Sequence, residues 1–368
     1  MVEHVLPLPR RWAAVRSGAE GRLDAAVVGG LSLLFGLIQL DDRPQSYDER
    51  VTAATATRSV GGIWHASRAT EAPHLLYYLL MKPWIAAFGG GLWSLRLPSV
   101  VVGAAAVAVL TVLGTKLFGR VAGLVAGFVL ASSAYVVQFM QEARGYAFAL
   151  LLAVLAVYCF VRMLEEPTMR WALLASAALV AACWMNLFSI SVLVAEAAAY
   201  LAVRPRPPRG PYAVAAGVAL AGIAPIVALV ASADNGQLGW IPPLTASRFI
   251  SQSRDWADHN PVALLVALIG VVALLRGFRA WARWKGGLVV VWTVTPYILL
   301  LALTAIQPSF DSHYLLTGAA GLALLVGAGV AALPGRVALA AGALVLAAAA
   351  VQLAHYYVVP GQSLGSLL

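Results

Sequence analysis

The segment PSVVVGAAAVAVLTVLGTKL at residues 98–117 decides the fold class of this chain. A helix of about 20 such apolar residues crosses the ~30 Å hydrocarbon core of a bilayer. The whole chain resembles this segment, because 61% of its 368 residues are hydrophobic and only 11% are charged. A soluble domain of this size cannot bury so much apolar surface. The sequence therefore predicts an all-α, polytopic integral membrane protein.

Eleven apolar segments predict transmembrane helices, with 171–203 divided into two short helices by a break at Met185-Asn186. Around them we expect an N-terminal segment at 1–22, a transmembrane domain at 23–355 and a tail at 356–368. The predicted helices cover 23–40, 98–117, 121–139, 146–163, 171–185, 187–203, 211–231, 261–275, 286–306, 315–333 and 336–354.

Basic residues are distributed unevenly between the two ends of these helices. With the N-terminus in the cytoplasm, 16 of the 25 Lys and Arg residues fall on the inner side, and every short inner loop carries at least one. This bias predicts a multi-pass plasma-membrane protein with long outer connections at 41–97 and 232–260 and an outer C-terminal tail. Anionic lipid accounts for the net charge of +9, so nucleic acid is not an expected partner.

The first outer connection contains an adjacent acid pair, Asp48 and Glu49. Ser46 and Glu49 fit a capping box, which predicts a helix over about 49–60 that ends at Gly61-Gly62. Two interpretations of the pair stay open. Acids in a first turn complement the helix dipole, whereas a carboxylate at the water–membrane boundary is also suited to chemistry.

A second helix is predicted at 74–88, with Pro73 at its first turn. Its 15 residues span about 22 Å, which is short for a membrane crossing. His74, Tyr77 with Tyr78, and Met81 with Lys82 share one face. This face indicates either a re-entrant helix that lines a cavity or an ordinary interfacial belt of aromatic and basic residues.

Four pieces of sequence appear in order: the acid pair, APHLLYYLLMKPW at 72–84, LWSLRLPSV at 92–100 and QEARGYA at 141–147. In this order and topology they resemble the GT-C type membrane glycosyltransferases, in particular the branch of protein O-mannosyltransferases and the bacterial aminoarabinose transferase. The resemblance covers about residues 40–200. Three departures stand out: the histidine follows the proline in APHLLYY, His313 stands where an arginine is common, and a soluble outer domain is missing after the last helix, as expected of a minimal or truncated member.

The resemblance implies transfer of a sugar from a polyprenyl-phosphate donor to an acceptor on the outer face. In that reaction Asp48 is expected to be the general base, and Glu49 either the helix cap or a second contact to the acceptor. Arg144 is the expected phosphate ligand; the alternative is an interfacial arginine paired with Glu142. The expected substrate-binding residues are Glu49, His74, Tyr78, Lys82, Glu142, Arg144 and His313.

Partners and cofactors follow from the same residues. The acceptor is expected to be a glycan, a lipoglycan or a protein, and membrane lipid surrounds the helices. The composition resembles proteins of high-GC actinobacteria, which favours mannose or arabinose as the sugar. No cofactor is required by the sequence, and the six scattered histidines indicate no metal cluster, but a divalent ion held by Asp48 or Glu49 with a substrate phosphate stays open.

Two other function classes remain. A transporter or lipid flippase would place charged or broken helices at the midplane and repeat one half of its fold. Here the sequence offers one acid inside a span, Glu196, and no visible repeat. The third class is a non-catalytic scaffold that has kept the fold, which the altered DSHYLL at 311–316 keeps open. Cys159 and Cys183 are expected to be small buried hydrophobic residues.

Overall fold

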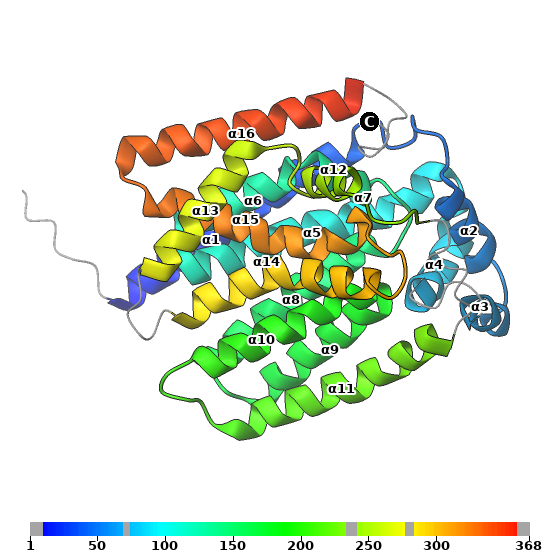
Figure 1. Ribbon diagram of the computed structural model, residues 1–368, viewed down its shortest axis with the longest axis horizontal. Coiled ribbons are helices and arrows are strands. Elements are labelled where there is room, and N and C mark those ends of the chain that lie inside the picture. The colour runs from blue at the N-terminus through cyan, green and yellow to red at the C-terminus, as the bar shows by residue number, and fades with distance from the viewer. Residues whose placement is uncertain (1–9, 69–73, 233–240, 277–282, 359–368) are drawn as a thin grey trace, which may run out of the picture.

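A computed structural model describes residues 10–68, 74–232, 241–276 and 283–358. Within these ranges every regular element is a helix, so the predicted all-α fold class is confirmed. Pro73 and the end of the predicted C-terminal tail, 359–368, lie outside the described residues. The helices form a long bundle, and several of them run close to its long axis (Figure 1).

Each predicted membrane segment coincides with a helix or with two consecutive helices. The break near Met185-Asn186 is also present, because α9 ends at Met185 and the Asn186 side chain accepts a hydrogen bond from the Phe188 N–H. The corresponding elements are α1 (Arg10–Leu37), α5 (Leu92–Phe118), α6 (Arg120–Ala131) with α7 (Ala134–Met140), α8 (Tyr146–Glu165), α9 (Met169–Met185), η3 (Leu187–Ile190) with α10 (Ser191–Ala202), α11 (Arg209–Ser232), α13 (Pro261–Arg276), α14 (Arg283–Thr304), η5 (Ser312–Leu315) with α15 (Leu316–Ala332), and α16 (Gly335–Val358).

The described part of the chain has more helices than candidate membrane spans. Among the described residues, six helices are long and apolar enough to cross a bilayer, and eight if each of two bent pairs counts as one span. The helices α9 and η3–α10 are apolar but shorter. The predicted number of eleven crossings therefore stays a prediction.

Two expectations about the long segments are wrong. The predicted helix 121–139 is broken, because α6 and α7 meet at an angle of 62°. Ser133 caps α7 by accepting from the Val136 N–H, so a new helix starts there. The connection 232–260, expected as a loop, contains α12 (Ala246–Trp256), which Thr245 caps and which bends by 80° into α13.

The first outer connection also folds differently from the prediction. The capping box is confirmed, because the Glu49 N–H donates to Ser46 Oγ at 3.2 Å and the Ser46 N–H donates to Glu49 Oε2 at 2.9 Å. The helix it opens, α2 (Tyr47–Ala56), is shorter than expected. Gly61-Gly62 does not end it; both lie inside α3 (Val60–Ala66), which Ser59 caps. The predicted short helix is confirmed as α4 (Leu75–Phe88).

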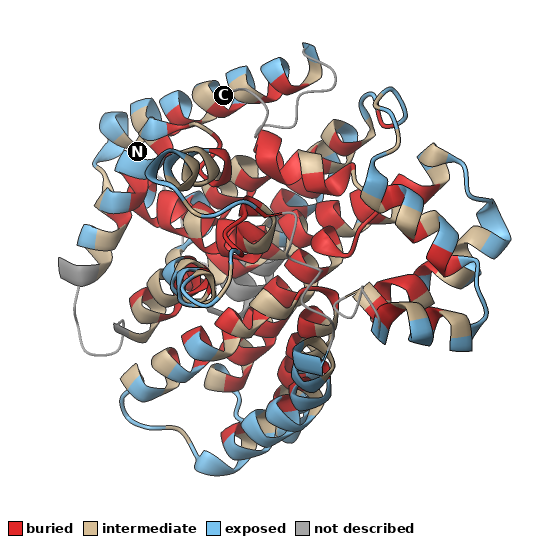
Figure 2. Ribbon diagram, turned by 45° about the vertical axis from the view of Figure 1, so that its right-hand side comes forward, coloured by how far each residue is buried: buried red, intermediate tan, exposed pale blue. Residues whose placement is uncertain are grey.

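The short helices gather at one end of the bundle. α2, α3 and α4 lie at the end opposite the start of α1, and the last turns of α16 reach the same end (Figure 1). Buried residues concentrate along the inner helices (Figure 2). In α15, 83% of the most apolar window is buried, compared with 17% in α11 and 22% in α16. The apolar side chains of α11 and α16 therefore face outward, as contact with lipid requires.

The central helix α15 packs against α13 through glycines. A methyl group on Gly329 would overlap with the carbonyl oxygen of Val266, and one on Gly270 would overlap with that of Leu325. The two backbones are therefore in direct contact, a common arrangement of membrane helices, in which small residues permit close packing.

We expect Gly329→Ala to lower the free energy of unfolding by about 1–3 kcal/mol, because the added methyl group forces α13 and α15 apart. Gly217→Ala in α11 is the matched control, since nothing lies within 4 Å of its added carbon, and it should be neutral or stabilise the helix by up to about 1 kcal/mol. Thermal unfolding of the two variants in detergent checks this. Equal melting temperatures would show that the contact has no energetic consequence.

Candidate active site

A buried ion pair supports the end of the bundle where the short helices gather. Arg96 of α5 donates from Nε to Glu49 Oε1 at 2.7 Å and from Nη2 to Glu49 Oε2 at 2.8 Å, and both side chains are less than 5% exposed. The Ala143 N–H also donates to Glu49 Oε1, at 3.1 Å. Burial alone would raise the pKa of Glu49, but the hydrogen bonds from Arg96, Ser46 and Ala143 hold it below its usual value.

These contacts assign Glu49 its role. The predicted cap is confirmed, and both carboxylate oxygens of the buried Glu49 accept hydrogen bonds from the protein. A second contact to the acceptor stays a prediction. Arg96 also donates from Nη1 to the Leu40 carbonyl at 2.7 Å. One ion pair thus joins the start of the first predicted outer loop, α5 and the turn at 141–145.

Asp48 points away from this ion pair and forms a second one. Its Oδ1 lies 2.9 Å from Nη2 of Arg144. The guanidinium is only 3% exposed, whereas Asp48 is 38% exposed. Arg144 also donates from Nη1 to the Tyr78 hydroxyl at 2.6 Å. An accessible carboxylate therefore lies over a buried cation whose direction is set by a tyrosine of α4.

The turn that carries Arg144 uses nearly every residue of the QEAR motif. Gln141 donates from Nε2 to the carbonyls of Gly36 and Ile38 and accepts from the Tyr356 hydroxyl, so it ties α1 and α16 to this turn. The Ala143 N–H reaches Glu49, and its carbonyl accepts from Thr52 at 3.0 Å. The QEAR motif therefore connects α1, α16 and α2 through hydrogen bonds, and it also supplies Arg144.

Glu142 lies among the charged groups of this site. Burial raises the pKa of its carboxyl to about 7; the nearby charge of His313 opposes this shift, and Asp48 adds to it. Burial and the charge of Arg144 hold the pKa of His74 well below its usual value. Both effects favour the neutral imidazole, and the expected role of His74 in substrate binding stays a prediction.

Aromatic rings form one wall of the cluster. Tyr146 lies 6.1 Å from His74 and 5.7 Å from His313 between ring centroids, so it stands between the two histidines. Phe139 packs edge-on against His313 at 5.1 Å. Such packing restricts the orientations open to the imidazole of His313.

The imidazole of His313 is also held by a carboxylate. Its Nδ1 forms a short hydrogen bond with Oδ1 of Asp311, and the Asp311 side chain accepts from the His313 N–H at 3.1 Å. Arg248 of α12 lies 3.2 Å from the other oxygen of Asp311. Burial would raise the pKa of Asp311, but the charge and hydrogen bonds of His313 and the charge of Arg248 hold it below its usual value.

The structure brings most of the predicted site residues together. One cluster contains Asp48, Tyr78, Glu142 and Arg144 together with His74 and His313. Glu49 is buried next to Asp48 in α2 and binds Arg96 and the Ala143 N–H. Lys82 does not join them, because its ammonium group donates to the Arg58 carbonyl at 2.6 Å. Their roles toward a substrate stay predictions. Glu196 is buried in α10, and its Oε1 has no hydrogen-bond partner among the described residues.

Several residues of the cluster were not predicted. Tyr146 and Arg96 lie inside quoted motifs, QEARGYA and LWSLRLPSV, so the motif itself was the signal that pointed to them. Asp311 also lies inside a quoted stretch, DSHYLL, two residues before His313, whereas Arg248 had no such signal because its partner Asp311 is 63 residues away. The described residues contain no group of three or more His, Cys, Asp and Glu side chains placed to hold a metal ion, and the question of a divalent ion stays open.

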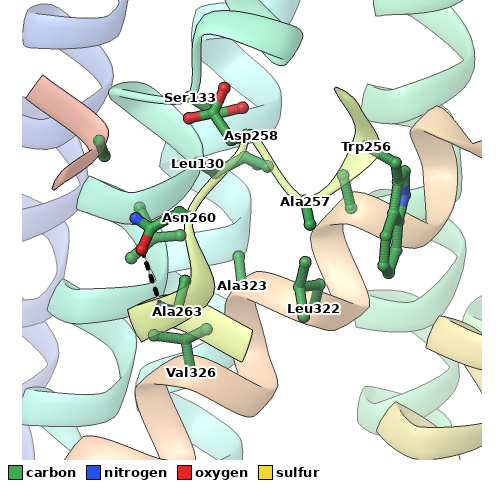
Figure 3. Close-up of a pocket in the computed structure, with 13 residues that line it drawn as sticks. Leu130, Ser133, Trp256, Ala257, Asp258, Asn260, Ala263, Leu322, Ala323 and Val326 are labelled. Carbon is green, nitrogen blue, oxygen red and sulfur yellow. Dashed lines mark hydrogen bonds between the residues drawn. The ribbon is translucent and has the colours of Figure 1, made fainter. Parts of the chain in front are cut away.

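A small cavity lies beside the cluster and is distinct from it. Ser133, Trp256, Asp258 and Asn260 line it together with alanines and leucines of α6, α13 and α15 (Figure 3). Its polar groups are engaged: Asp258 accepts from the Tyr135 N–H, and Asn260 accepts from the Ala263 N–H. At about 30 Å³ it has room for water but not for a sugar.

We expect Glu49→Gln to lower the free energy of unfolding by about 3 kcal/mol or more, because the buried Arg96 loses its compensating charge. Since the pKa of Glu49 is lowered on folding, its contribution is full above about pH 4.5 and is lost as the pH falls through the lower, folded-state pKa. The wild type should therefore lose more stability on acidification than the variant does. Unfolding in detergent at pH 7 and below pH 4.5 measures both effects.

Glu165→Gln is the matched control for this experiment. Glu165 pairs with Lys116 at 2.8 Å, but the carboxylate is 42% exposed. Its loss should cost less than about 1 kcal/mol. Equal effects of the two substitutions would contradict the importance of the buried pair.

The family described as dolichyl-phosphate-mannose-protein mannosyltransferase matches residues 63–229. No curated protein sequence is significantly similar to the chain.

Three solved structures have a similar fold. ArnT from Cupriavidus metallidurans in the apo state is 17% identical, with a TM-score of 0.61 over 87% of this chain and 62% of that one. The same protein bound to undecaprenyl phosphate is 15% identical, with a TM-score of 0.58 over 84% and 60%. The Archaeoglobus fulgidus oligosaccharyltransferase is 10% identical, with a TM-score of 0.65 over 93% and 56%.

The chain spans about three fifths of the length of each of these structures. Residues 63–229 match a mannosyltransferase family, and the helices superimpose on those of ArnT and of an oligosaccharyltransferase. The resemblance expected from the sequence is therefore confirmed, and the chain has the fold of the GT-C type polytopic glycosyltransferases.

Proposed function

We propose that this protein is a glycosyltransferase that moves a sugar from a polyprenyl-phosphate donor to an acceptor on the outer face of the membrane. The observation that carries the proposal is the pair formed by the accessible Asp48 and the buried Arg144 at the end of the bundle. A carboxylate and a cation in contact offer a base for an acceptor hydroxyl and a ligand for a phosphate, the two groups that such a transfer needs.

In the proposed reaction, an acceptor hydroxyl attacks the anomeric carbon of the donor sugar. The new C–O bond forms as the bond from that carbon to the phosphate oxygen breaks, and the electron pair leaves with the polyprenyl phosphate. Asp48 takes the proton of the hydroxyl. Arg144, oriented by Tyr78 at 2.6 Å, stabilises the charge that develops on the phosphate.

Support for the donor class comes from the comparisons and from the site. One of the similar structures is described as bound to undecaprenyl phosphate, and the matching family is described by its dolichyl-phosphate-mannose donor. Mannose or arabinose is the sugar we propose, and a glycan, lipoglycan or protein is the acceptor. We also propose a plasma-membrane location with the N-terminus in the cytoplasm and the site outside, in line with the charge bias of the loops.

We expect Asp48→Asn to reduce the rate of transfer at least about 100-fold while donor binding is retained, because the amide cannot take a proton. The measurement is a membrane assay with radiolabelled polyprenyl-phosphate-mannose and polyprenyl-phosphate-arabinose. Asp42→Asn, an exposed acid of the same loop, is the matched control and should keep wild-type activity.

Two outcomes would contradict the proposal at different levels. Full transfer by the Asp48→Asn protein would remove Asp48 as the base. No transfer from either donor by the wild type would favour a transporter or flippase, or a scaffold that has kept the fold.

We expect the donor KM to rise about fivefold between pH 6 and pH 8. Over this range Glu142 loses its proton, since its pKa lies at about 7, and a new negative charge near Arg144 and His313 repels the donor phosphate. A donor phosphodiester carries one charge throughout this range. Glu142→Gln should flatten the profile, whereas Glu165→Gln, at the other end of α8, should leave it unchanged. A persistent slope in the Glu142→Gln protein would assign the pH dependence to another group.

A further inference from the structure

One face of α12 holds the chain segment that carries His313. Arg248, Gln252 and Trp256 stand four residues apart, so they follow one another along a single side of the helix. All three side chains form hydrogen bonds with residues 310–315, which we call the 310–315 segment.

The hydrogen bonds reach both ends and the middle of the 310–315 segment. Arg248 donates to the Phe310 carbonyl at 3.3 Å from Nη2 and contacts Asp311 from the same nitrogen. Gln252 Oε1 accepts from the Ser312 N–H at 2.6 Å. Trp256 donates from Nε1 to the Leu315 carbonyl at 3.0 Å.

These contacts continue to the imidazole through Asp311. Arg248 holds Oδ2 of Asp311, while Oδ1 of the same carboxylate holds Nδ1 of His313. A carboxylate on one ring nitrogen fixes the direction in which the other nitrogen points. The edges of Phe139 and Tyr146 limit rotation of the ring. The orientation of His313 is therefore determined from α12, about 60 residues earlier in the chain.

We propose that α12 positions His313 toward the donor phosphate, with Arg248, Gln252 and Trp256 acting as positioning residues. This inference rests on the proposed function. The side-chain hydrogen bonds of all three go to the 310–315 segment, so we place their influence on the site in that segment. The second nitrogen of His313 then offers a hydrogen bond to a phosphate oxygen on the side of the site opposite α4.

Arg254 of α12 provides a matched control. It is exposed on another side of the same helix and loses the same charge on substitution. An effect of the net charge of α12 would appear equally in Arg248→Ala and Arg254→Ala, whereas an effect through Asp311 and His313 would appear only in the first.

The test measures the affinity of purified wild-type and variant proteins in detergent for radiolabelled polyprenyl-phosphate-mannose, together with KM and kcat for transfer. We expect Arg248→Ala to weaken donor binding about tenfold, with a smaller change in kcat, and Arg254→Ala to have no effect. Arg248→Lys, which keeps a cation beside Asp311, should restore most of the affinity. Gln252→Leu should weaken binding in the same direction and serves as the second variant if Arg248→Ala fails to fold.

A double mutant separates positioning from general structural damage. In a His313→Gln background, Arg248→Ala should cause no further loss of affinity, because the group on which it acts is gone. Additive losses, or an unchanged affinity in Arg248→Ala, would overturn the positioning role while leaving the proposed function intact. A wild-type protein that neither binds nor uses the donor would instead overturn the proposed function itself.

Discussion

The buried ion pair between Glu49 and Arg96 is the constraint on which the site depends. Successive residues of an α-helix point about 100° apart, so the two members of the acid pair have different surroundings. Because Arg96, Ser46 and Ala143 all bind Glu49, that side chain is buried, and Asp48, about 100° further round α2, keeps a partly exposed carboxylate that reaches Arg144. One buried interaction thus accounts for the cap of α2, for the orientation of this helix and for the exposure of the Asp48 carboxylate.

A second constraint comes from the apolar surroundings, where broken helices leave backbone groups that need partners. The helices break between α6 and α7 and again between α12 and α13, and a hydrogen bond joins the two breaks. Asp258, at the second break, accepts from the Tyr135 N–H, at the first break, at 3.0 Å. The Tyr135 hydroxyl then donates to the Ser312 carbonyl. The two breaks are therefore joined to the 310–315 segment, and the polar residues of the site gather where the helices are interrupted.

The sequence predicted those features that depend on local pattern. Apolar length located the membrane helices, the spacing of Ser46 and Glu49 located the cap, and four ordered motifs located Asp48, Tyr78, Glu142 and Arg144. The missed features depend on contacts between distant parts of the chain. Arg96 lies 47 residues from Glu49, and Arg248 lies 63 residues from Asp311. Lys82 is the opposite case. Helical spacing placed it on the same face as His74, but its ammonium group donates to the Arg58 carbonyl.

The unequal exposure of Asp48 and Arg144 bears on how two substrates would approach the proposed site. Arg144 is buried and donates to the Tyr78 hydroxyl, so in the proposed reaction the donor phosphate would have to reach the guanidinium. Because that phosphate competes with Asp48 for the same cation, binding of the donor would loosen the ion pair. The Asp48 carboxylate, released from the guanidinium, would then be free on the accessible side, where the acceptor hydroxyl of the proposed reaction would arrive. The order of binding and the activation of the base would then follow from one exchange of partners at Arg144.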